Sequence, residues 1–275
     1  MRVRLWGTRG SVARAGPETV RYGGDTAAVE VRGGDESVLI LDGGSGLLLM
    51  TPRLENVRRI DLLLTHLHMD HVQGLGFFPP LRDSGIETHL WGPVSTTLTL
   101  EERLLRYLSP PLFPVRLRDF KELHLHDVGP GTHEIGSFGV DADLIAHPGS
   151  TLGFRIRQER GGTLAYLPDH EPALGEPEWV VDPRWTSGFD LIKGVDVVIH
   201  DAQYTEEEYR RRVGWGHSTL AHAITLASGA GARALVPFHH DPEHTDDDID
   251  RMLAAARVPE GLKVIPGRIG LELEV

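Results

Sequence analysis

Three histidines and one aspartate lie within six residues of one another, at His66, His68, Asp70 and His71. Imidazole and carboxylate groups bind zinc, manganese or iron, and the chain has no cysteine that could add a thiolate ligand. In an extended or turning segment, residues two apart share a face, so His66 and His68 can bind one ion. Asp70 and His71 follow on the next turn and can face a second ion. A histidine-rich solvated loop is the alternative, which four potential ligands directly after an apolar segment disfavour.

The elements that must position this run can be predicted from apolar spacing. Residues 60–65 form an apolar segment that predicts a buried strand leading directly to the run. Further strands are predicted at residues 1–6, 27–32, 37–41, 87–91, 120–126, 138–146, 151–158, 163–167, 195–200 and 234–238. Helices are predicted at residues 96–108, 205–213, 219–230 and 246–256. Strands dominate the start and alternate with helices later, which predicts layered sheets covered by helices in a single domain over residues 1–275.

The composition excludes several classes of protein. The chain is 40% hydrophobic, enough for a sizeable core, and its net charge is −12. An acidic surface repels phosphate backbones unless basic groups gather in one place, which argues against a general nucleic-acid coat protein. The net charge does not exclude a local phosphate-binding pocket. The first residues contain no apolar stretch of signal-peptide length. No window approaches about 20 uninterrupted apolar residues. We therefore expect a cytoplasmic protein without a membrane span.

Residues 65–71, Thr-His-Leu-His-Met-Asp-His, resemble the HxHxDH signature of the metallo-β-lactamase superfamily. The resemblance covers nearly the whole chain and implies an α/β fold, a four-layer αβ/βα sandwich with the site at one edge of its two sheets. His147, in Ala-His-Pro-Gly, resembles the next ligand of this family. Asp169 resembles the carboxylate that bridges two metals, and His239 resembles the final ligand after the last core strand.

The resemblance assigns these residues to two divalent ions, with zinc first and manganese or iron as alternatives. It gives one ion to His66, His68, His147 and Asp169, and the other to Asp70, His71, Asp169 and His239. A water between two such ions loses a proton near neutral pH, which makes a metal-bridging hydroxide the nucleophile. Asp70 is expected to orient that hydroxide, and Asp42 resembles a carboxylate that orients a ligand histidine.

A second pair of motifs narrows the expected reaction. Residues 199–202, Ile-His-Asp-Ala, and residues 216–219, Gly-His-Ser-Thr, resemble the HEAT and HST motifs of tRNase Z type phosphodiesterases. The resemblance implies that His217 is the general acid for the leaving oxygen and that Asp201 holds it charged and aimed. A residue preceding the Ser-Thr cap of a helix is the structural alternative for His217. Asp201 stands where the resemblance leads us to expect glutamate, so its reach is shorter by one methylene.

The expected substrate is a small phosphodiester such as a cyclic nucleotide. The tRNase Z enzymes carry a Gly/Pro-rich arm that grasps tRNA, commonly inserted between the third ligand motif and the bridging aspartate. Only 21 residues separate His147 from Asp169, and they predict a strand, a hairpin and another strand. An RNA-processing endonuclease of tRNase Z type is therefore the alternative, with nucleic acid as a less favoured partner. A homodimer would be ordinary for phosphodiesterases of the tRNase Z type.

Two further classes of function stay open. A lactonase or thioesterase would use the same metals against a carbonyl and would need His217 less. A binding or sensing protein with an idle metal site would hold its ions without turnover, which the intact ligand set argues against.

Several weaker signals have less specific interpretations. His124 and His126 also lie two apart, but no later histidine completes the motif, so an exposed strand face is favoured. Arg9 and Ser11 lie in a glycine-rich loop that either contacts a phosphate or is an ordinary connector. The charged residues 206–212 predict a solvated helix face. The remaining histidines at 89, 133, 222 and 244 are expected to be structural or exposed, and His170 and His240 to line the site.

Overall fold

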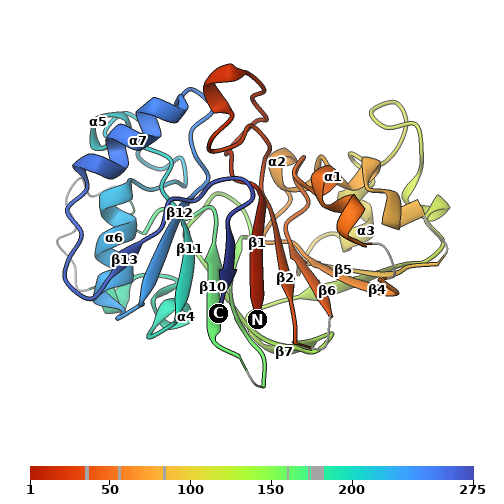
Figure 1. Ribbon diagram of the computed structural model, residues 1–275. Helices are drawn as coiled ribbons and strands as arrows, with labels where there is room; N and C mark the ends of the chain where they lie inside the picture. The colour runs from red at the N-terminus through yellow and green to blue at the C-terminus, as the bar shows by residue number, and fades with distance from the viewer. Residues whose placement is uncertain (35–36, 55–56, 83–84, 160, 173, 175–182) are drawn as a thin grey trace.

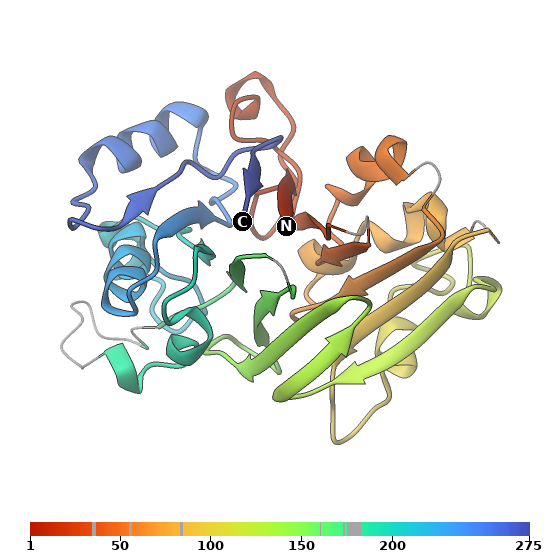
Figure 2. The same cartoon turned by 60° about the horizontal axis from the view of Figure 1, so that its bottom comes forward.

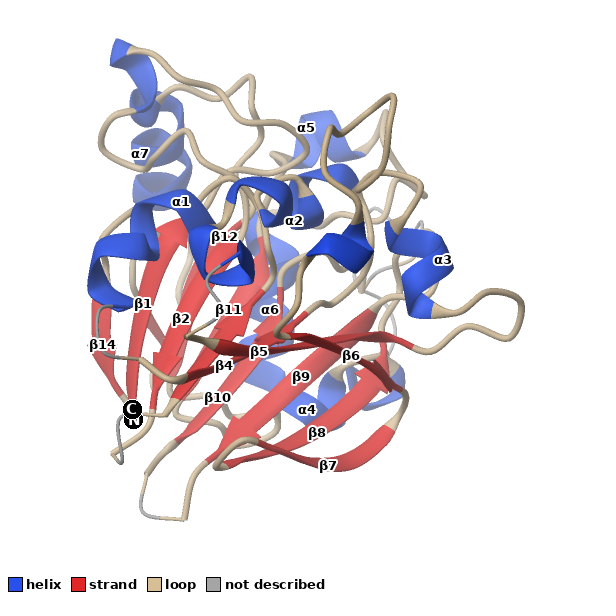
Figure 3. Ribbon diagram, turned by 90° about the vertical axis from the view of Figure 1, so that its right-hand side faces the viewer, coloured by secondary structure: helices blue, strands red, loops and turns tan. Residues whose placement is uncertain are grey.

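The computed structural model describes residues 1–275 except residues 35–36, 55–56, 83–84, 160, 173 and 175–182. Two mixed sheets pack face to face (Figures 1 and 3). The first follows the order β14 (Glu272–Glu274), β1 (Arg2–Gly7), β2 (Ala28–Arg32), β3 (Val38–Leu41), β4 (Arg59–Leu63), β5 (Glu87–Pro93) and β6 (Leu123–Val128). The second follows the order β13 (Lys263–Val264), β12 (Ala234–Phe238), β11 (Val197–Asp201), β10 (Thr163–Leu167), β9 (Leu152–Arg157), β8 (Phe138–Leu144) and β7 (Gly131–Ile135).

Helices cover the outer face of each sheet (Figure 1). The α-helices are α1 (Leu47–Met50), α2 (Met69–Val72), α3 (Leu100–Leu104), α4 (Phe189–Ile192), α5 (Glu206–Tyr209), α6 (Leu220–Gly229) and α7 (Asp246–Ala255). Short 3-10 helices lie at Pro17–Thr19, Thr51–Leu54, Leu75–Phe77, Pro79–Arg82, Leu117–Asp119 and Pro183–Trp185. Among the described residues, no helix is both long and apolar enough to cross a membrane.

Three apolar cores separate the layers of the molecule. Leu39 and Leu41 of β3 belong to the core between the sheets, whereas Ile40 belongs to the core under α1 and α3. A third core joins the outer face of the second sheet to α4 and α6. Because both faces of the central strands are buried, their sequences are continuous apolar runs rather than alternating ones. These layers confirm the predicted four-layer αβ/βα sandwich.

Strand pairing in the first sheet brings the two ends of the chain together. β14 pairs antiparallel with β1, with Arg2 opposite Glu274. The Met1 amino group donates to the Val275 carbonyl at 2.9 Å, and the two termini lie side by side in both views (Figures 1 and 2). The last strand of the chain therefore completes the first sheet.

All of the predicted strands are present, most within about two residues of their expected ends, except that β6 begins three residues late. The predicted helices at residues 219–230 and 246–256 appear as α6 and α7. Those at residues 96–108 and 205–213 are shorter, as α3 and α5, because turns follow each of them. After α3, for example, the Tyr107 and Leu108 amides both donate to the Leu104 carbonyl.

Four strand ends determine where the candidate site forms. β10, β11 and β12 are parallel neighbours, so their carboxyl ends meet at one edge of the second sheet. Beyond β10 lies Asp169, β11 ends at Asp201, and His239 directly follows β12. β4 of the first sheet delivers the chain to His66. The two sheets thus contribute side chains to a common edge.

Candidate metal centre

The structure brings the seven predicted ligands together in the two predicted groups. His66, His68, His147 and Asp169 form one group, and Asp70, His71, Asp169 and His239 form the other. Within each group, one nitrogen or oxygen atom per residue lies within 4.8 Å of all the others. The second group is wholly buried, while His68 is exposed and His147 partly so. The centre therefore opens to solvent on the side of the first group.

Asp169 lies between the two groups and presents one carboxylate oxygen to each. Its Oδ2 lies 3.7 Å from His66 Nε2 and 3.6 Å from His147 Nε2. Its Oδ1 lies 3.0 Å from His71 Nε2 and 3.3 Å from His239 Nε2. This is the geometry that a carboxylate shared by two cations requires.

Buried atoms without partners show that these residues fit a divalent cation. His66 Nε2, His71 Nε2 and Asp169 Oδ1 are buried and make no hydrogen bond of good geometry, although the last two atoms lie 3.0 Å apart. Leaving a buried polar atom unpaired costs about 1–3 kcal/mol, so three such atoms facing a common space are unfavourable unless something binds them. Imidazole nitrogens together with carboxylate oxygens suit zinc, manganese and iron.

Asp42 holds the start of the histidine run. It is fully buried at the end of β3, and its Oδ2 accepts from His71 Nδ1–H at 2.8 Å. The Thr65 amide and the Tyr166 hydroxyl donate to the same carboxylate at 2.8 and 2.9 Å. His71 is thereby fixed in the tautomer that leaves Nε2 free for a ligand position.

Two residues that the sequence did not single out orient other histidines. Gln203 Oε1 accepts from His239 Nδ1–H at 2.9 Å. The Gly216 carbonyl accepts from His147 Nδ1–H at 2.8 Å, and its amide donates to Glu171 Oε2, also at 2.8 Å. No motif or spacing pointed to Gln203 or Glu171, because their contacts depend on loops that meet only in the folded chain.

Charge in the centre follows from burial and from the mutual contacts. Burial lowers the pKa values of His66, His68 and His147, which favours the neutral form that binds metals. Burial alone would raise the pKa of Asp169, but the surrounding histidines outweigh it and hold that pKa well below its usual range. Burial lowers the pKa of His71, yet Asp169, Asp70 and Asp42 together raise it well above its usual value. A cation at that position would compete with this proton.

His217 and Asp201 form a buried pair beside the two groups. His217 Nδ1–H donates to Asp201 Oδ2 at 2.7 Å, and Asp201 Oδ1 accepts from the amide of Ser218 at 3.0 Å. The His217 ring stacks on His239 at 4.9 Å between centroids. Burial lowers the pKa of His217, but the charge and hydrogen bond of Asp201 outweigh it and raise this pKa to about 9. The raised pKa favours the charged imidazole at neutral pH.

The helix-cap alternative agrees with the position of His217, which precedes the Ser218–Thr219 cap of α6, but it does not account for the bond to Asp201. Thr219 is the N-cap of α6, and its hydroxyl accepts from the His222 amide. His217 lies two residues earlier and contacts the centre.

The Arg9–Ser11 loop divides into two roles. Arg9 is fully buried and donates to the carbonyls of Gly23, Asp241 and His244. Its guanidinium therefore holds the loop in place, as expected of a connector, and does not contact a phosphate. Ser11 reaches the centre through its backbone, because its amide donates to Asp70 Oδ2 at 2.8 Å.

The charged run at residues 206–212 is only partly a solvated face. Arg211 and Glu207 are exposed, as predicted. Arg212 instead lies over the Tyr204 ring at 4.9 Å and 3.8 Å from Asp241. The helix ends before Arg212, which lets this side chain turn inward.

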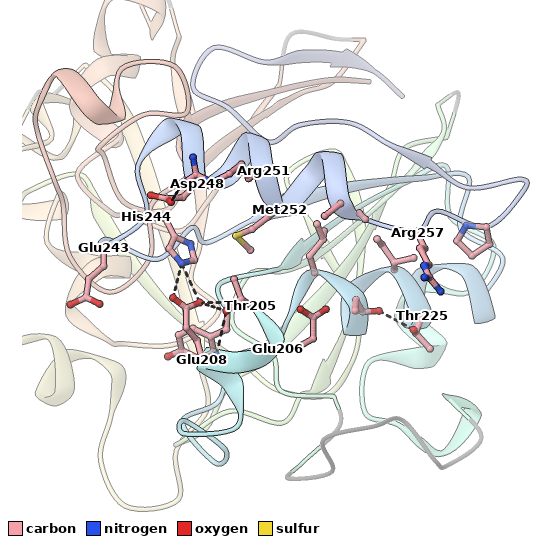
Figure 4. Close-up of a pocket in the computed structure, with 17 residues that line it drawn as sticks. Thr205, Glu206, Glu208, Thr225, Glu243, His244, Asp248, Arg251, Met252 and Arg257 are labelled. Carbon is pink, nitrogen blue, oxygen red and sulfur yellow. Dashed lines mark hydrogen bonds and ion pairs between the residues drawn. The ribbon is translucent and has the colours of Figure 1, made fainter.

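A cavity of about 910 Å³ lies between α5, α6 and α7 (Figure 4). His244 bonds Glu208 across its wall at 3.0 Å. Tyr204 lines it and places its ring edge-on to His217 at 5.8 Å. The cavity is separate from the two ligand groups, none of whose residues lines it.

Comparisons with known proteins identify the family and the fold of the chain. Residues 38–240 match the family model of the Beta-lactamase superfamily domain. A protein named Ribonuclease Z from Limosilactobacillus fermentum is 31% identical over 230 residues, covering 70% of this chain and 73% of that protein. The metallo-beta-lactamase fold protein YhfI from Bacillus subtilis superposes with a TM-score of 0.72 at 17% identity, covering 100% of this chain and 98% of that one. A structure described as a new diphosphatase from the PhnP family gives a TM-score of 0.67 at 19% identity, with 100% and 98% coverage. The chain belongs to the metallo-β-lactamase superfamily of hydrolases.

Proposed function

We propose that this protein is a dinuclear, metal-dependent phosphodiesterase that acts on a small phosphodiester such as a cyclic nucleotide. The observation that carries the proposal is the His217–Asp201 pair at 2.7 Å, next to a carboxylate that faces two groups of histidines. A leaving alkoxide on phosphorus needs a proton, and a charged imidazole held by a buried carboxylate supplies one. A carbonyl hydrolase has less need of such an acid.

The residues divide the work as follows. Two divalent ions, zinc first, would be held by the two groups and would lower the pKa of a water and neutralise charge on the phosphate. Asp70 keeps its carboxylate ionised, because the histidines around it outweigh burial and hold its pKa below the usual range. The Ser11 amide aims that carboxylate into the centre. His217 donates the Nε2 proton to the leaving oxygen, while Asp201 stays ionised and stabilises the imidazole through Nδ1.

The size of the substrate is inferred from what lies between the ligands. The interval from His147 to Asp169 contains the paired strands β9 and β10. This interval therefore forms a hairpin of the second sheet instead of the inserted arm that grasps tRNA in tRNase Z enzymes. The net charge of −12 also disfavours a long phosphate backbone. A relative named Ribonuclease Z favours RNA as the second candidate, whereas the neighbour described as a diphosphatase agrees with a small phosphate compound.

Reconstitution with zinc, manganese or iron tests the proposal. We expect hydrolysis of bis(p-nitrophenyl) phosphate and of a cyclic nucleotide, and little cleavage of a tRNA precursor. His217→Ala should keep its metals and lose about 10²- to 10⁴-fold in rate. Absence of phosphodiester turnover with all three metals would contradict the proposal. Cleavage of the tRNA precursor at the higher rate would favour the endonuclease instead.

Ester substrates separate the carbonyl alternative from the phosphodiesterase. A lactonase or thioesterase should hydrolyse its substrate without His217, so ester turnover that survives His217→Ala would favour that class. Full metal occupancy with no turnover of phosphodiesters, lactones or thioesters would favour a sensing protein.

A further inference from the structure

Three histidines outside the candidate metal centre share one face of the first sheet. His89 lies on β5, and His124 and His126 lie on β6, the edge strand of that sheet. In the parallel ladder His89 is the register partner of His124, and Trp91 is the partner of His126. Residues two apart on a strand point to the same side, and Trp91 packs against the core between the sheets. The three imidazoles therefore lie on the inner face of the sheet. Their strands, β5 and β6, lie at its edge (Figure 3).

The side chains are in direct contact. His89 Nδ1 lies 2.8 Å from His126 Nε2, and His89 Nε2–H donates to Glu87 Oε1 at 2.8 Å. The His124 ring stacks on His89 at 5.0 Å between centroids. The rings of His126 and Trp91 stack at 4.0 Å, which fixes His126 from its other face.

Glu87 determines which nitrogen of His89 carries the proton. Because a carboxylate accepts, Nε2 is protonated, and Nδ1 accepts the hydrogen bond that His126 Nε2–H donates at 2.8 Å, so a cation bound by both nitrogens would displace that proton. A carboxylate that holds one ring nitrogen while the other faces a ligand position is the usual arrangement at metal-binding histidines. His71 and Asp42 show the same pairing in the candidate centre, with the nitrogens exchanged.

The contact between His89 and His126 also resembles one inside the candidate centre. There, His147 Nε2 and His68 Nδ1 lie 3.1 Å apart within one ligand group. The His89 side chain is only 12% exposed, whereas His124 is exposed.

We propose that His89 and His126, completed by His124, bind one late first-row transition-metal cation such as Zn²⁺ or Cu²⁺, separately from the candidate centre. The pair supplies two nitrogens on adjacent strands, and a turn of the exposed His124 ring supplies the third. Imidazole ligands suit this class of cation, and copper binds most tightly among the divalent ions of the series. The proposal does not depend on the phosphodiesterase function, because no residue is shared with the two ligand groups.

Copper binding to the zinc-loaded protein tests this site. One equivalent of Cu²⁺ is added after the centre has been filled with zinc, and the electron paramagnetic resonance spectrum is recorded. We expect splitting from two or three nitrogens and one bound copper per chain. The double variant His89→Gln/His126→Gln should lose that copper while retaining the zinc of the centre and the same melting temperature.

His133→Gln is the matched control, since His133 lies on β7 and bonds the Gly129 carbonyl at 2.8 Å. This variant should bind copper as the wild type does. Glu87→Gln should retain the ligands and weaken copper binding about ten- to a hundredfold, the usual effect of removing an orienting carboxylate. Equal copper binding by the wild type and the double variant would overturn the proposal. Loss of the signal in His133→Gln would also overturn it.

Discussion

At the scale of single residues, Asp201 controls the charge of His217. Its Oδ1 accepts from the amides of Gln203 and Ser218 at 3.0 Å each, and its Oδ2 accepts from His217 Nδ1–H. These backbone donors thus hold the carboxylate in place independently of the imidazole. This rigidity explains how an aspartate can serve where a longer glutamate was expected, since β11 itself ends at this residue.

The first prediction concerns the pH dependence of the proposed reaction. The folded-state pKa of His217 is raised to about 9, so the charged acid is present below that pH and is lost as pH rises through it. The rate should therefore fall above pH 9, and the contribution of this pair to folding should fade between 6.5 and 9. In Asp201→Asn, burial prevails and the alkaline fall should move below pH 7.

Measuring this profile requires a control for folding and metal content. Asp196→Asn lies just before the same strand, where Asp196 bonds Thr163 and Arg233 instead of the centre. It should leave the alkaline fall in place. An unchanged profile in metal-loaded Asp201→Asn would contradict the assignment of His217 as the acid.

The second prediction concerns Glu171, which binds the segment at residues 209–216, whose Gly216 carbonyl bonds His147. Its Oε1 accepts from the Tyr209 hydroxyl and the Gly214 amide, and its Oε2 accepts from the Gly216 amide, all at 2.8 Å. In Glu171→Gln one acceptor becomes an NH₂ group facing a donor, which should cost about 1–3 kcal/mol of folding free energy. Because Gly216 orients His147, metal affinity should also fall.

Thermal unfolding and zinc titration measure both effects. Glu207→Gln is the control, since the Glu207 side chain is 81% exposed and should change stability by about 0.5 kcal/mol or less. A Glu171→Gln protein with unchanged melting temperature and zinc affinity would show that the loop is held by other contacts.

Site residues that belong to a local sequence motif could be predicted, whereas those whose contacts come from distant parts of the chain could not. The ligands could be proposed from the resemblance to the metallo-β-lactamase superfamily, because HxHxDH, Asp169 and His239 each follow a strand that the apolar pattern also predicts. Glu171 and Gln203 could not, because their partners come from loops 30 or more residues away. Arg9 was open to either interpretation, because a guanidinium that binds backbone carbonyls looks the same in sequence as one that binds phosphate.

At the scale of elements, the helices depend on their caps and packing more than on length. α7 begins with a capping box, in which Thr245 Oγ1 accepts from the Asp248 amide and Asp248 Oδ2 accepts from the Thr245 amide. In its first turn, Asp246 also accepts hydrogen bonds from the amides of Arg21 and Tyr22, in the loop that follows the 3-10 helix Pro17–Thr19.

The third prediction follows from this cap. Thr245→Ala removes the side-chain acceptor and should lower stability by about 1 kcal/mol. The rate of phosphodiester hydrolysis at a temperature well below unfolding should not change, because α7 contributes no residue to either ligand group. Thr225→Ala on the exposed side of α6 is the control, and a comparable loss there would show that the cap of α7 contributes nothing particular.

The elements that sequence reasoning missed are short or polar. β13 has two residues and β14 has three, too few for any alternation to be seen, and β7 is Gly-Thr-His-Glu-Ile with four of its five residues polar or glycine. Each exists because a longer strand beside it leaves hydrogen-bonding groups to pair. The strands around the core between the sheets were predicted because most of their own residues are apolar.

At the scale of the whole molecule, the candidate centre joins the two sheets. The loop after β4 brings His66, His68, Asp70 and His71 from the first sheet, and the second sheet brings His147, Asp169 and His239. Ions bound there would bind the folded chain and not the unfolded one, so metal and fold should be coupled.

The fourth prediction is that removing metal lowers the melting temperature and that restoring zinc raises it with zinc concentration. At a hundredfold excess over the dissociation constant, each ion should add about 2.7 kcal/mol to the free energy of unfolding. His68→Gln, which alters one group at its exposed side, should lose part of this gain. Asp169→Asn should lose most of it, because Asp169 belongs to both groups. If the two variants lost the gain equally, or if zinc stabilised Asp169→Asn as well as the wild type, the carboxylate would not link the two positions, and the dinuclear proposal would fail with it.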